Sequence, residues 1–260
     1  MIVNNKLGIV LSGGGFRGIA HLGILEYIRE LDIKYDVISG ASAGALLGAF
    51  IAEGYQPNEV LKIARDEKIM GYSMLSIKRG GFFNSSIFEK IIQKYIPHDS
   101  FEGLKMQLFA SVTDLTNAQS LIFNHGSLSF ALKASCCFPL VFQPVHYKDD
   151  IYLCDGGLMN NFPVEQVRAI CNKTIGINVN PMNKMEGDLN FTGIINRIIR
   201  IVTSSYKESS KTSCDIYMEP LEINQFTTFD TKKIEAIFDF GYNYAQNFKD
   251  EFLKIKTSKI

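Results

Sequence analysis

Residues 6–53 show the same order of segments twice, and this order restricts the fold more than any other feature of the chain. Lys6–Ser12 is a short apolar run closed by glycines, and residues 18–31 then carry apolar side chains at helical spacing. Residues 35–39 form a second apolar run, which a small-residue turn joins to an Ala- and Leu-rich segment at 43–53. Short buried strands that alternate with helices are typical of a mainly parallel sheet covered by helices. The sequence therefore predicts an α/β fold.

The rest of the chain continues this pattern less regularly. Two strands at 106–115 and 119–123 are expected to pair, because a short turn separates two runs of β-forming residues. Further strands are expected at 151–154, 173–179 and 215–219, and further helices at 57–70, 86–96, 128–137, 164–170, 192–210 and 232–252. Because no repeat, low-complexity tract or linker composition interrupts the chain, residues 1–260 are predicted to form a single domain.

The composition narrows the range of partners. Hydrophobic residues make up 46% of the chain, and Lys plus Arg equals Asp plus Glu at 27 each, so no net basic field attracts nucleic acid. The first residues lack the features of a secretory signal, and the longest uncharged apolar stretch, 37–52, is too short and glycine-rich to span a bilayer. We expect a cytoplasmic protein whose only membrane contact is peripheral, at the inner surface.

No motif indicates a metal ion or a cofactor. The five cysteines have no metal-type spacing, and we expect reduced thiols. A carboxylate-rich calcium loop is also absent from the sequence.

The turn Gly40-Ala41-Ser42-Ala43-Gly44 lies between the second expected strand and its helix. A G-x-S-x-G sequence in this position places the serine on a strained turn that exposes its hydroxyl group. We expect Gly40 and Gly44 to be glycines because a larger side chain would collide with neighbouring backbone. The start of the following helix also favours a developing negative charge. We therefore predict that Ser42 is a nucleophile.

Such a serine needs a base, and the positions of the histidines argue against imidazole. All four precede Asp155: His21, His98, His125 and His146. With Asp155 as the acid, the order serine, acid, histidine cannot be completed, although an earlier acid paired with a later histidine stays open. Asp155-Gly156-Gly157 ends an expected strand, and active sites of α/β folds form at the carboxyl ends of parallel strands. We predict that Asp155 is itself the base, with a pKa that burial raises above its usual value of about 3.9.

A glycine loop joins the first strand to its helix. Its residues are Gly13, Gly14, Gly15, Phe16, Arg17 and Gly18. The loop contains G-x-G-x-x-G, but the acidic residue that a dinucleotide site needs at the end of the next strand is absent, because Asp36 lies at the start of that strand. We expect the loop amides to form an oxyanion hole. Arg17 is expected to brace the loop, to form a structural salt bridge or to meet an anionic headgroup.

Three motifs in this order resemble the patatin-like phospholipase family: GGGFRG at 13–18, GASAG at 40–44 and DGG at 155–157. Residues 134–139 resemble the A-S-x-x-x-P segment of the family, and Asn161-Phe162-Pro163 and Gly241-Tyr242 are similar to its compact bacterial members. The resemblance implies a three-layer α/β/α fold. It also implies a Ser42–Asp155 dyad without histidine, an oxyanion hole at 13–18 and a structural role for His21.

The activity implied by this resemblance is that of a serine acyl hydrolase acting on phospholipid, lysophospholipid or acylglycerol esters. Two alternatives stay open, namely a regulatory or scaffold protein that keeps the hydrolase fold and a nucleotide-binding module that uses GGGFRG. Residues 71–88 surround Lys78 and Arg79 with apolar side chains. This segment is interpreted either as an interfacial lid over an acyl groove or as a loop packed on the core.

Overall fold

The computed structural model describes residues 6–67, 85–139, 141–182, 184, 190–204, 208–228 and 232–258. Eight strands in these ranges form one sheet in the order β5-β6-β3-β2-β1-β7-β8, and β4 pairs with β3. The strands are β1 (Leu7–Leu11), β2 (Val37–Ala41), β3 (Gln107–Asp114), β4 (Gln119–Phe123), β5 (Val145–His146), β6 (Tyr152–Asp155), β7 (Lys173–Ile177) and β8 (Ile216–Met218). The pairs between β3, β2, β1, β7 and β8 are parallel, whereas β4, β5 and β6 pair antiparallel. The sheet is therefore mainly parallel, as expected.

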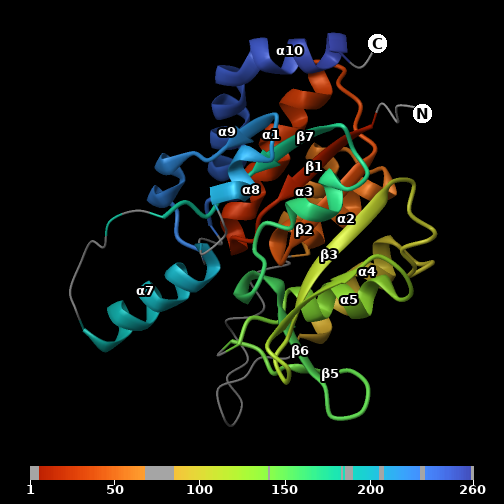
Figure 1. Cartoon of the computed structure of the whole chain (residues 1–260), viewed down its shortest axis with the longest axis vertical. Helices are drawn as coiled ribbons and strands as arrows, with labels where there is room; N and C mark the ends of the chain where they lie inside the picture. Colours follow the sequence, from red (N-terminus) through yellow and green to blue (C-terminus); the bar gives the residue numbers. More distant parts are fainter. Residues whose placement is uncertain are drawn as a thin grey trace.

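Helices cover both faces of the sheet, which gives three layers (Figure 1). The α-helices are α1 (Ile19–Glu30), α2 (Ala43–Glu53), α3 (Pro57–Asp66), α4 (Ser86–Tyr95), α5 (Leu128–Ser135), α6 (Val164–Arg168), α7 (Phe191–Ser204), α8 (Glu208–Thr212), α9 (Ile234–Ala245) and α10 (Lys249–Ser258). Short 3-10 turns are η1 (Gly15–Gly18), η3 (Gly156–Leu158), η4 (Leu221–Gln225) and η5 (Gln246–Phe248). The predicted α/β/α architecture is confirmed.

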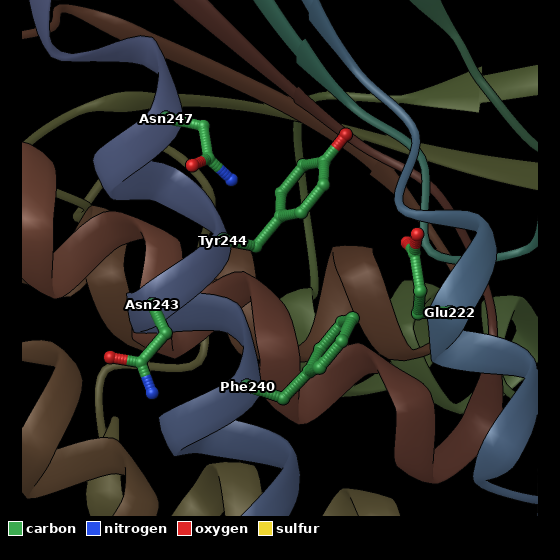
Figure 2. A pocket seen from close by; sticks show the side chains of 5 residues that line it. All are labelled: Glu222, Phe240, Asn243, Tyr244 and Asn247. Atoms are coloured by element: carbon green, nitrogen blue, oxygen red, sulfur yellow. The ribbon is translucent and has the colours of Figure 1, made fainter.

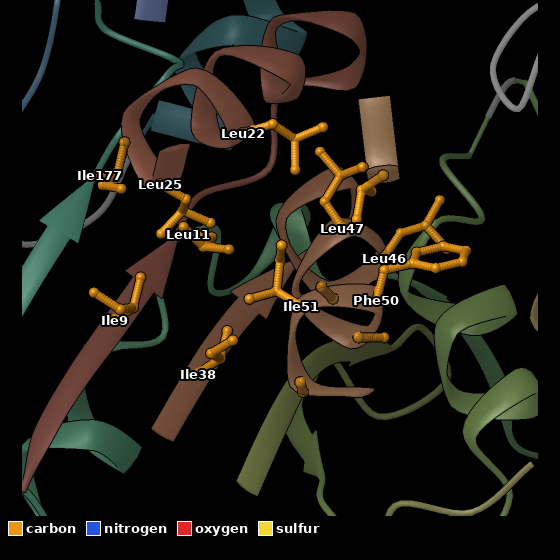
Figure 3. Packing of buried hydrophobic residues seen from close by; sticks show 14 of the residues in the cluster. Ile9, Leu11, Leu22, Leu25, Ile38, Leu46, Leu47, Phe50, Ile51 and Ile177 are labelled. Carbon is orange, nitrogen blue, oxygen red and sulfur yellow. The ribbon is translucent and has the colours of Figure 1, made fainter. Parts of the chain in front are cut away.

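The first strand shows how the sequence produces these layers. Successive side chains of a strand point to opposite faces. Ile9 and Leu11 lie in the large core on the side of α1 and α2, whereas Val10 joins a smaller cluster with Val167 of α6. Figure 3 shows the large core between strands and helices, with these labelled side chains: Ile9, Leu11, Leu22, Leu25, Ile38, Leu46, Leu47, Phe50, Ile51 and Ile177.

Of the two long predicted helices, one differs from the structure. The helix expected at 192–210 is described as α7 up to Ser204 and as α8 from Glu208, and the residues between them lie outside the described ranges. The helix expected at 232–252 consists of α9, the turn η5 and the start of α10, which runs in a new direction (Figure 1). Aromatic side chains at helical spacing continue through this turn, at Tyr244, Phe248 and Phe252, so periodicity alone does not reveal the break.

The segment interpreted as a lid lies largely outside the described residues. The structure describes its end, where Ser86–Phe88 form the first residues of α4. The helix expected at 57–70 is α3, which ends at Asp66, and residues 68–70 are likewise not described.

Candidate active site

The sheet register brings Ser42 and Asp155 together. Ala41, the last residue of β2, pairs with Ser111 of β3, and Asp155, the last residue of β6, pairs with Val112. The other edge of β3 is occupied by β4 over Ala110–Asp114. Because a strand has only two edges, β2 and β6 share one edge of β3 and meet there end to end. Their carboxyl ends therefore place residues 42 and 155 side by side.

This arrangement corrects the expectation that Asp155 ends a parallel strand. β6 runs antiparallel to β3. Asp155 nevertheless reaches the carboxyl edge of the parallel strands, because β3 extends past the end of β2 and β6 returns along this extension. Asp155 therefore lies at the expected edge of the sheet, but the expected direction of its strand was wrong.

Ser42 lies on a strained turn, as predicted. Its φ of 51° and ψ of −123° are unusual for a residue with a side chain and cost about 1–3 kcal/mol. A Cβ atom on Gly40 would lie 2.6 Å from the Ala45 nitrogen, and one on Gly44 would lie 2.3 Å from the Leu11 oxygen. Both glycines are therefore required by close backbone, as expected from the motif.

The hydroxyl group of Ser42 donates a hydrogen bond of 2.6 Å to Oδ2 of Asp155. The other carboxyl oxygen, Oδ1, accepts the Gly157 amide at 2.7 Å. Asp155 is only 3% exposed, and this burial raises its pKa to about 7, although the hydrogen bonds from Ser42 and Gly157 act in the opposite direction. The carboxyl group can therefore accept a proton near neutral pH, as the sequence predicted.

Three residues of β3 and α5 support this pair. Ser135 accepts the Ser42 amide at 2.9 Å and donates to the Ser111 carbonyl at 2.7 Å. Thr113 donates to the Asp155 carbonyl at 2.9 Å. Ser111 and Thr113 are polar residues in an otherwise apolar run, which is a signal in the sequence, but their roles were not predicted.

The DGG glycines fit closely against the same supports. A Cβ atom on Gly156 would lie 2.2 Å from the Ser111 carbonyl oxygen. One on Gly157 would lie 2.9 Å from Oδ1 of Asp155 and 2.8 Å from Oδ1 of Asn161. Any larger residue would therefore push apart the groups that hold the carboxylate.

The glycine loop lies against the serine, since a Cβ atom on Gly13 would be 3.2 Å from that of Ser42. The Gly13 amide, however, is engaged by Asn161, at 3.1 Å to its side-chain oxygen and 3.3 Å to its carbonyl oxygen. This differs from the expectation that Gly13 donates to an oxyanion. In the sequence, Asn161 is only part of a tripeptide similar to the family's compact bacterial members, and its bond to the loop was not predicted.

Some of the other loop amides donate hydrogen bonds within the protein, and others do not. The Phe16 amide donates to the Thr228 carbonyl and the Arg17 amide to the Gly14 carbonyl. Among the described residues, the amides of Gly14 and Gly15 have no acceptor. Gly15 has a φ of 57°, which favours glycine, and a Cβ atom there would lie 2.6 Å from the Thr228 carbonyl oxygen. Two of the predicted oxyanion donors are thus available.

Arg17 is buried beneath the loop. Its Nε donates to the Phe226 carbonyl at 2.8 Å, and Nη1 donates to Oδ1 of Asn180 at 3.5 Å. Burial, followed by repulsion from Arg200, lowers the pKa of Arg17 to about 10. Of the three interpretations, this geometry supports bracing of the loop, because a buried guanidinium group cannot reach a headgroup in solvent.

The histidines do not contact Ser42 or Asp155. His21 is fully buried, donates to the Ser12 carbonyl at 2.9 Å and has a pKa that burial lowers to about 4, which supports a structural role. The other three bond to Glu53, Asn124 and the Asp149 carbonyl. Within the described ranges, no group of three or more His, Cys, Asp or Glu residues is arranged for a metal ion.

A pocket of about 300 Å³ lies between η4 on one side and α9 and η5 on the other (Figure 2). It is lined by Glu222, Phe240, Asn243, Tyr244 and Asn247. None of the predicted site residues contributes to it, so we do not assign the substrate to this pocket.

The site therefore belongs to the class in which a serine on a strand-to-helix turn is bonded to a buried carboxylate. A family model described as patatin-like phospholipase matches residues 9–168, which include all three motifs. The chain belongs to the patatin-like phospholipase family.

Curated relatives agree with this assignment. The chain is 26% identical to mouse "patatin-like phospholipase domain-containing protein 6", over 95% of this chain and 21% of that protein. It is also 26% identical to "lysophospholipase NTE1" of Scheffersomyces stipitis, over 94% of this chain and 18% of that protein. The chain thus spans about a fifth of the length of these relatives.

A solved structure shows the same fold. The crystal structure of VipD from Legionella pneumophila superposes with a TM-score of 0.57 at 14% identity, covering 96% of this chain and 67% of that one. None of the helices in the described ranges is long and apolar enough to cross a membrane.

Proposed function

We propose that the protein is a serine acyl hydrolase that cleaves carboxylic ester bonds of lipids, with Ser42 as nucleophile and Asp155 as base. The observation that carries this proposal is the 2.6 Å hydrogen bond from the Ser42 hydroxyl to the buried Asp155 carboxylate. Membership of the patatin-like phospholipase family and the name of the lysophospholipase relative support a lipid ester as the substrate.

In the first half-reaction, the Ser42 oxygen attacks the ester carbonyl carbon while Asp155 accepts the hydroxyl proton. The carbonyl π electrons move to oxygen, and the resulting oxyanion accepts hydrogen bonds from the amides of Gly14 and Gly15. Each donor of this kind contributes on the order of 10² to 10³ in rate. The bond to the alcohol then breaks, and the leaving alkoxide takes the proton from Asp155, which leaves an acyl group on Ser42.

The second half-reaction repeats these steps with water. Asp155, again ionised, accepts a proton from a water molecule whose oxygen attacks the acyl carbon. The new tetrahedral intermediate collapses by breaking the bond to the Ser42 oxygen, which regains the proton from Asp155. The fatty acid is released and the free hydroxyl group is restored.

The environment of Asp155 suits this role. A carboxyl group with an ordinary pKa of about 3.9 is a weak base, whereas a base with a pKa near the working pH combines ionisation with proton affinity. Burial brings the pKa of Asp155 to about 7. No histidine is then needed as an intermediary.

Substitution of the two residues tests the proposal. We expect Ser42→Ala and Asp155→Asn each to lower kcat/KM for a p-nitrophenyl acyl ester by at least about 10³-fold, because each removes a group that acts in the transition state. A fluorophosphonate probe should label Ser42 in the unsubstituted protein, as identified by peptide mapping. Circular dichroism should show that both variants are folded.

Asp114→Asn provides a matched control, since Asp114 is a buried carboxylate at the end of β3 that bonds to Asn117 and not to Ser42. This variant should retain activity within about threefold of the unsubstituted protein. Full ester turnover by Ser42→Ala or Asp155→Asn would disprove the dyad.

The alternative functions have less support. A nucleotide module needs most of the loop amides for phosphate, but those of Gly13, Phe16 and Arg17 donate to acceptors within the protein. A regulatory protein needs neither a strained serine nor a carboxylate bonded to it. Failure of the probe to label Ser42 would favour that second alternative.

A further inference from the structure

Helix α7 presents apolar side chains to solvent. Ile194, Ile198 and Ile201 are 42%, 50% and 47% exposed. At 3.6 residues per turn, this spacing places the three side chains on one face of the helix, and we call them the isoleucine stripe. A surface helix ordinarily turns such a face toward the core. The isoleucine stripe therefore needs an explanation.

The opposite side of α7 explains why the stripe faces outward. Arg200 donates a hydrogen bond to the side chain of Asn224. Thr203 accepts a hydrogen bond from the Asn180 side chain at 2.9 Å, and Ser204 donates to the Asn180 carbonyl at 3.0 Å. The helix is thus attached to the body through polar groups. Figure 1 shows α7 extending outward from this attachment at its C-terminal end.

The location of α7 relates the stripe to the candidate active site. The helix contacts η3, the turn that directly follows Asp155. Met159, next to that turn, and Met182, beyond the end of β7, are also exposed. These exposed side chains belong to segments that follow the carboxyl ends of β6 and β7, at the edge of the sheet where Ser42 and Asp155 meet.

The charge of α7 indicates what covers the stripe. The helix contains Arg197 and Arg200 and no carboxylate. Arg197 lies one turn from Ile194 and Ile201 and therefore flanks the stripe. An apolar face with a basic residue beside it, on a helix without acidic residues, favours a position in the plane of a membrane interface with anionic lipids.

We propose that the isoleucine stripe of α7 inserts into a lipid surface and holds the active-site edge of the protein against it. This inference rests on the proposed function in one respect, namely that the ester substrate resides in a lipid aggregate. Arg197 then lies at the level of the anionic headgroups. The ester bond is presented to Ser42 from the surface on which α7 lies.

A single tryptophan tests the insertion directly, because the chain contains none. The Ile198→Trp variant should show a blue-shifted emission on addition of phosphatidylcholine vesicles that contain a minority of phosphatidylglycerol. Lipids brominated on the acyl chain should quench this emission. The Leu253→Trp variant, with the probe at an exposed position of α10, should show neither effect. Unchanged Ile198→Trp emission with these vesicles would overturn the proposal.

The triple variant Ile194→Asn, Ile198→Asn, Ile201→Asn tests the consequence. We expect its partitioning onto the same vesicles to fall by about tenfold or more, while Leu253→Asn partitions like the unsubstituted protein. Hydrolysis of an ester embedded in the vesicles should fall in parallel, and turnover of a soluble short-chain ester should stay within about twofold. Arg197→Gln should weaken binding to vesicles that contain phosphatidylglycerol and should leave binding to pure phosphatidylcholine vesicles unchanged.

The outcomes separate the two proposals. Vesicle binding can be measured with the Ser42→Ala variant, so it tests the role of α7 even where no ester is hydrolysed. Absence of turnover in the soluble ester assay would count against the Ser42–Asp155 dyad alone. Triple-variant binding equal to that of the unsubstituted protein would overturn the membrane role. A change of oligomeric state in the triple variant without lipid would overturn it in favour of a protein contact.

Discussion

The pKa of Asp155 depends on the surroundings of its carboxyl group. Burial raises its pKa, and the hydrogen bonds from Ser42 and Gly157 lower it. Because burial dominates, the carboxyl group titrates near neutral pH and not near 4. The hydrogen bond of 2.6 Å to the Ser42 hydroxyl gives this titration a direct consequence for proton transfer.

We therefore expect kcat/KM for a soluble ester to rise with pH and to level off above about pH 7. The base acts only when ionised, so each unit below its pKa lowers the rate about tenfold. Stopped-flow or plate assays across pH 5 to 9 would give this profile. A profile that is flat down to pH 5 would contradict the assignment of Asp155 as the base.

The pH dependence of the free energy of unfolding checks the pKa of Asp155 independently, because it needs no substrate. The folded protein binds the Asp155 proton more tightly than the unfolded chain, so its free energy of unfolding falls as pH rises from about 4 to about 7. Asp155→Asn removes this loss and should raise the free energy of unfolding by about 1–3 kcal/mol at pH 8. The difference from the unsubstituted protein should disappear near pH 4.

At the level of elements, the site depends on contacts between segments that are far apart in the chain. The ends of β2 and β6 meet beside β3, and α5 is tied to both through Ser135. The glycine loop is held to the segment after η3 by the bond between the Gly13 amide and Asn161. Asn161 therefore acts as a positioning residue for the loop.

We expect Asn161→Ala to lower kcat by about tenfold or more while KM changes little, because the loop would shift relative to the oxyanion and not relative to the bound lipid. Loss of the buried acceptor should also cost about 1–2 kcal/mol of stability. Steady-state kinetics and denaturant unfolding measure the two effects. Loss of stability with unchanged kcat would show that Asn161 has only a structural role.

At the level of the whole molecule, apolar side chains lie in two different environments, the core and the exposed face of α7. The large core joins the sheet to α1 and α2, and Ile38 is fully buried within it (Figure 3). The isoleucine stripe lies outside this core, on a helix that is attached through polar groups. The same residue type should therefore contribute very differently to stability at the two places.

We expect Ile38→Ala to lower the free energy of unfolding by about 2–5 kcal/mol and Ile198→Ala to change it by less than about 0.5 kcal/mol. The first substitution leaves a cavity, whereas the second removes a side chain already in contact with water. Urea unfolding followed by circular dichroism measures both. An effect of Ile198→Ala above about 2 kcal/mol would mean that α7 packs by its apolar face in solution.

The sequence by itself determined the fold class, the strained turn at Ser42 and the candidacy of Asp155. Each of these depends on local patterns: strands and helices follow from hydrophobic periodicity, and the strained turn follows from a G-x-S-x-G sequence between an expected strand and an expected helix. The division of 232–252 into two helices could not be predicted in this way, because the apolar spacing continues across η5.

Only the tertiary structure decided which strand edge brings Asp155 to Ser42, which loop amides are engaged and which way α7 faces. The antiparallel direction of β6, the capture of the Gly13 amide by Asn161 and the polar attachment of α7 are contacts between distant residues. Periodicity reports which side of a segment is apolar, but what covers that side is set by the packing of the whole chain.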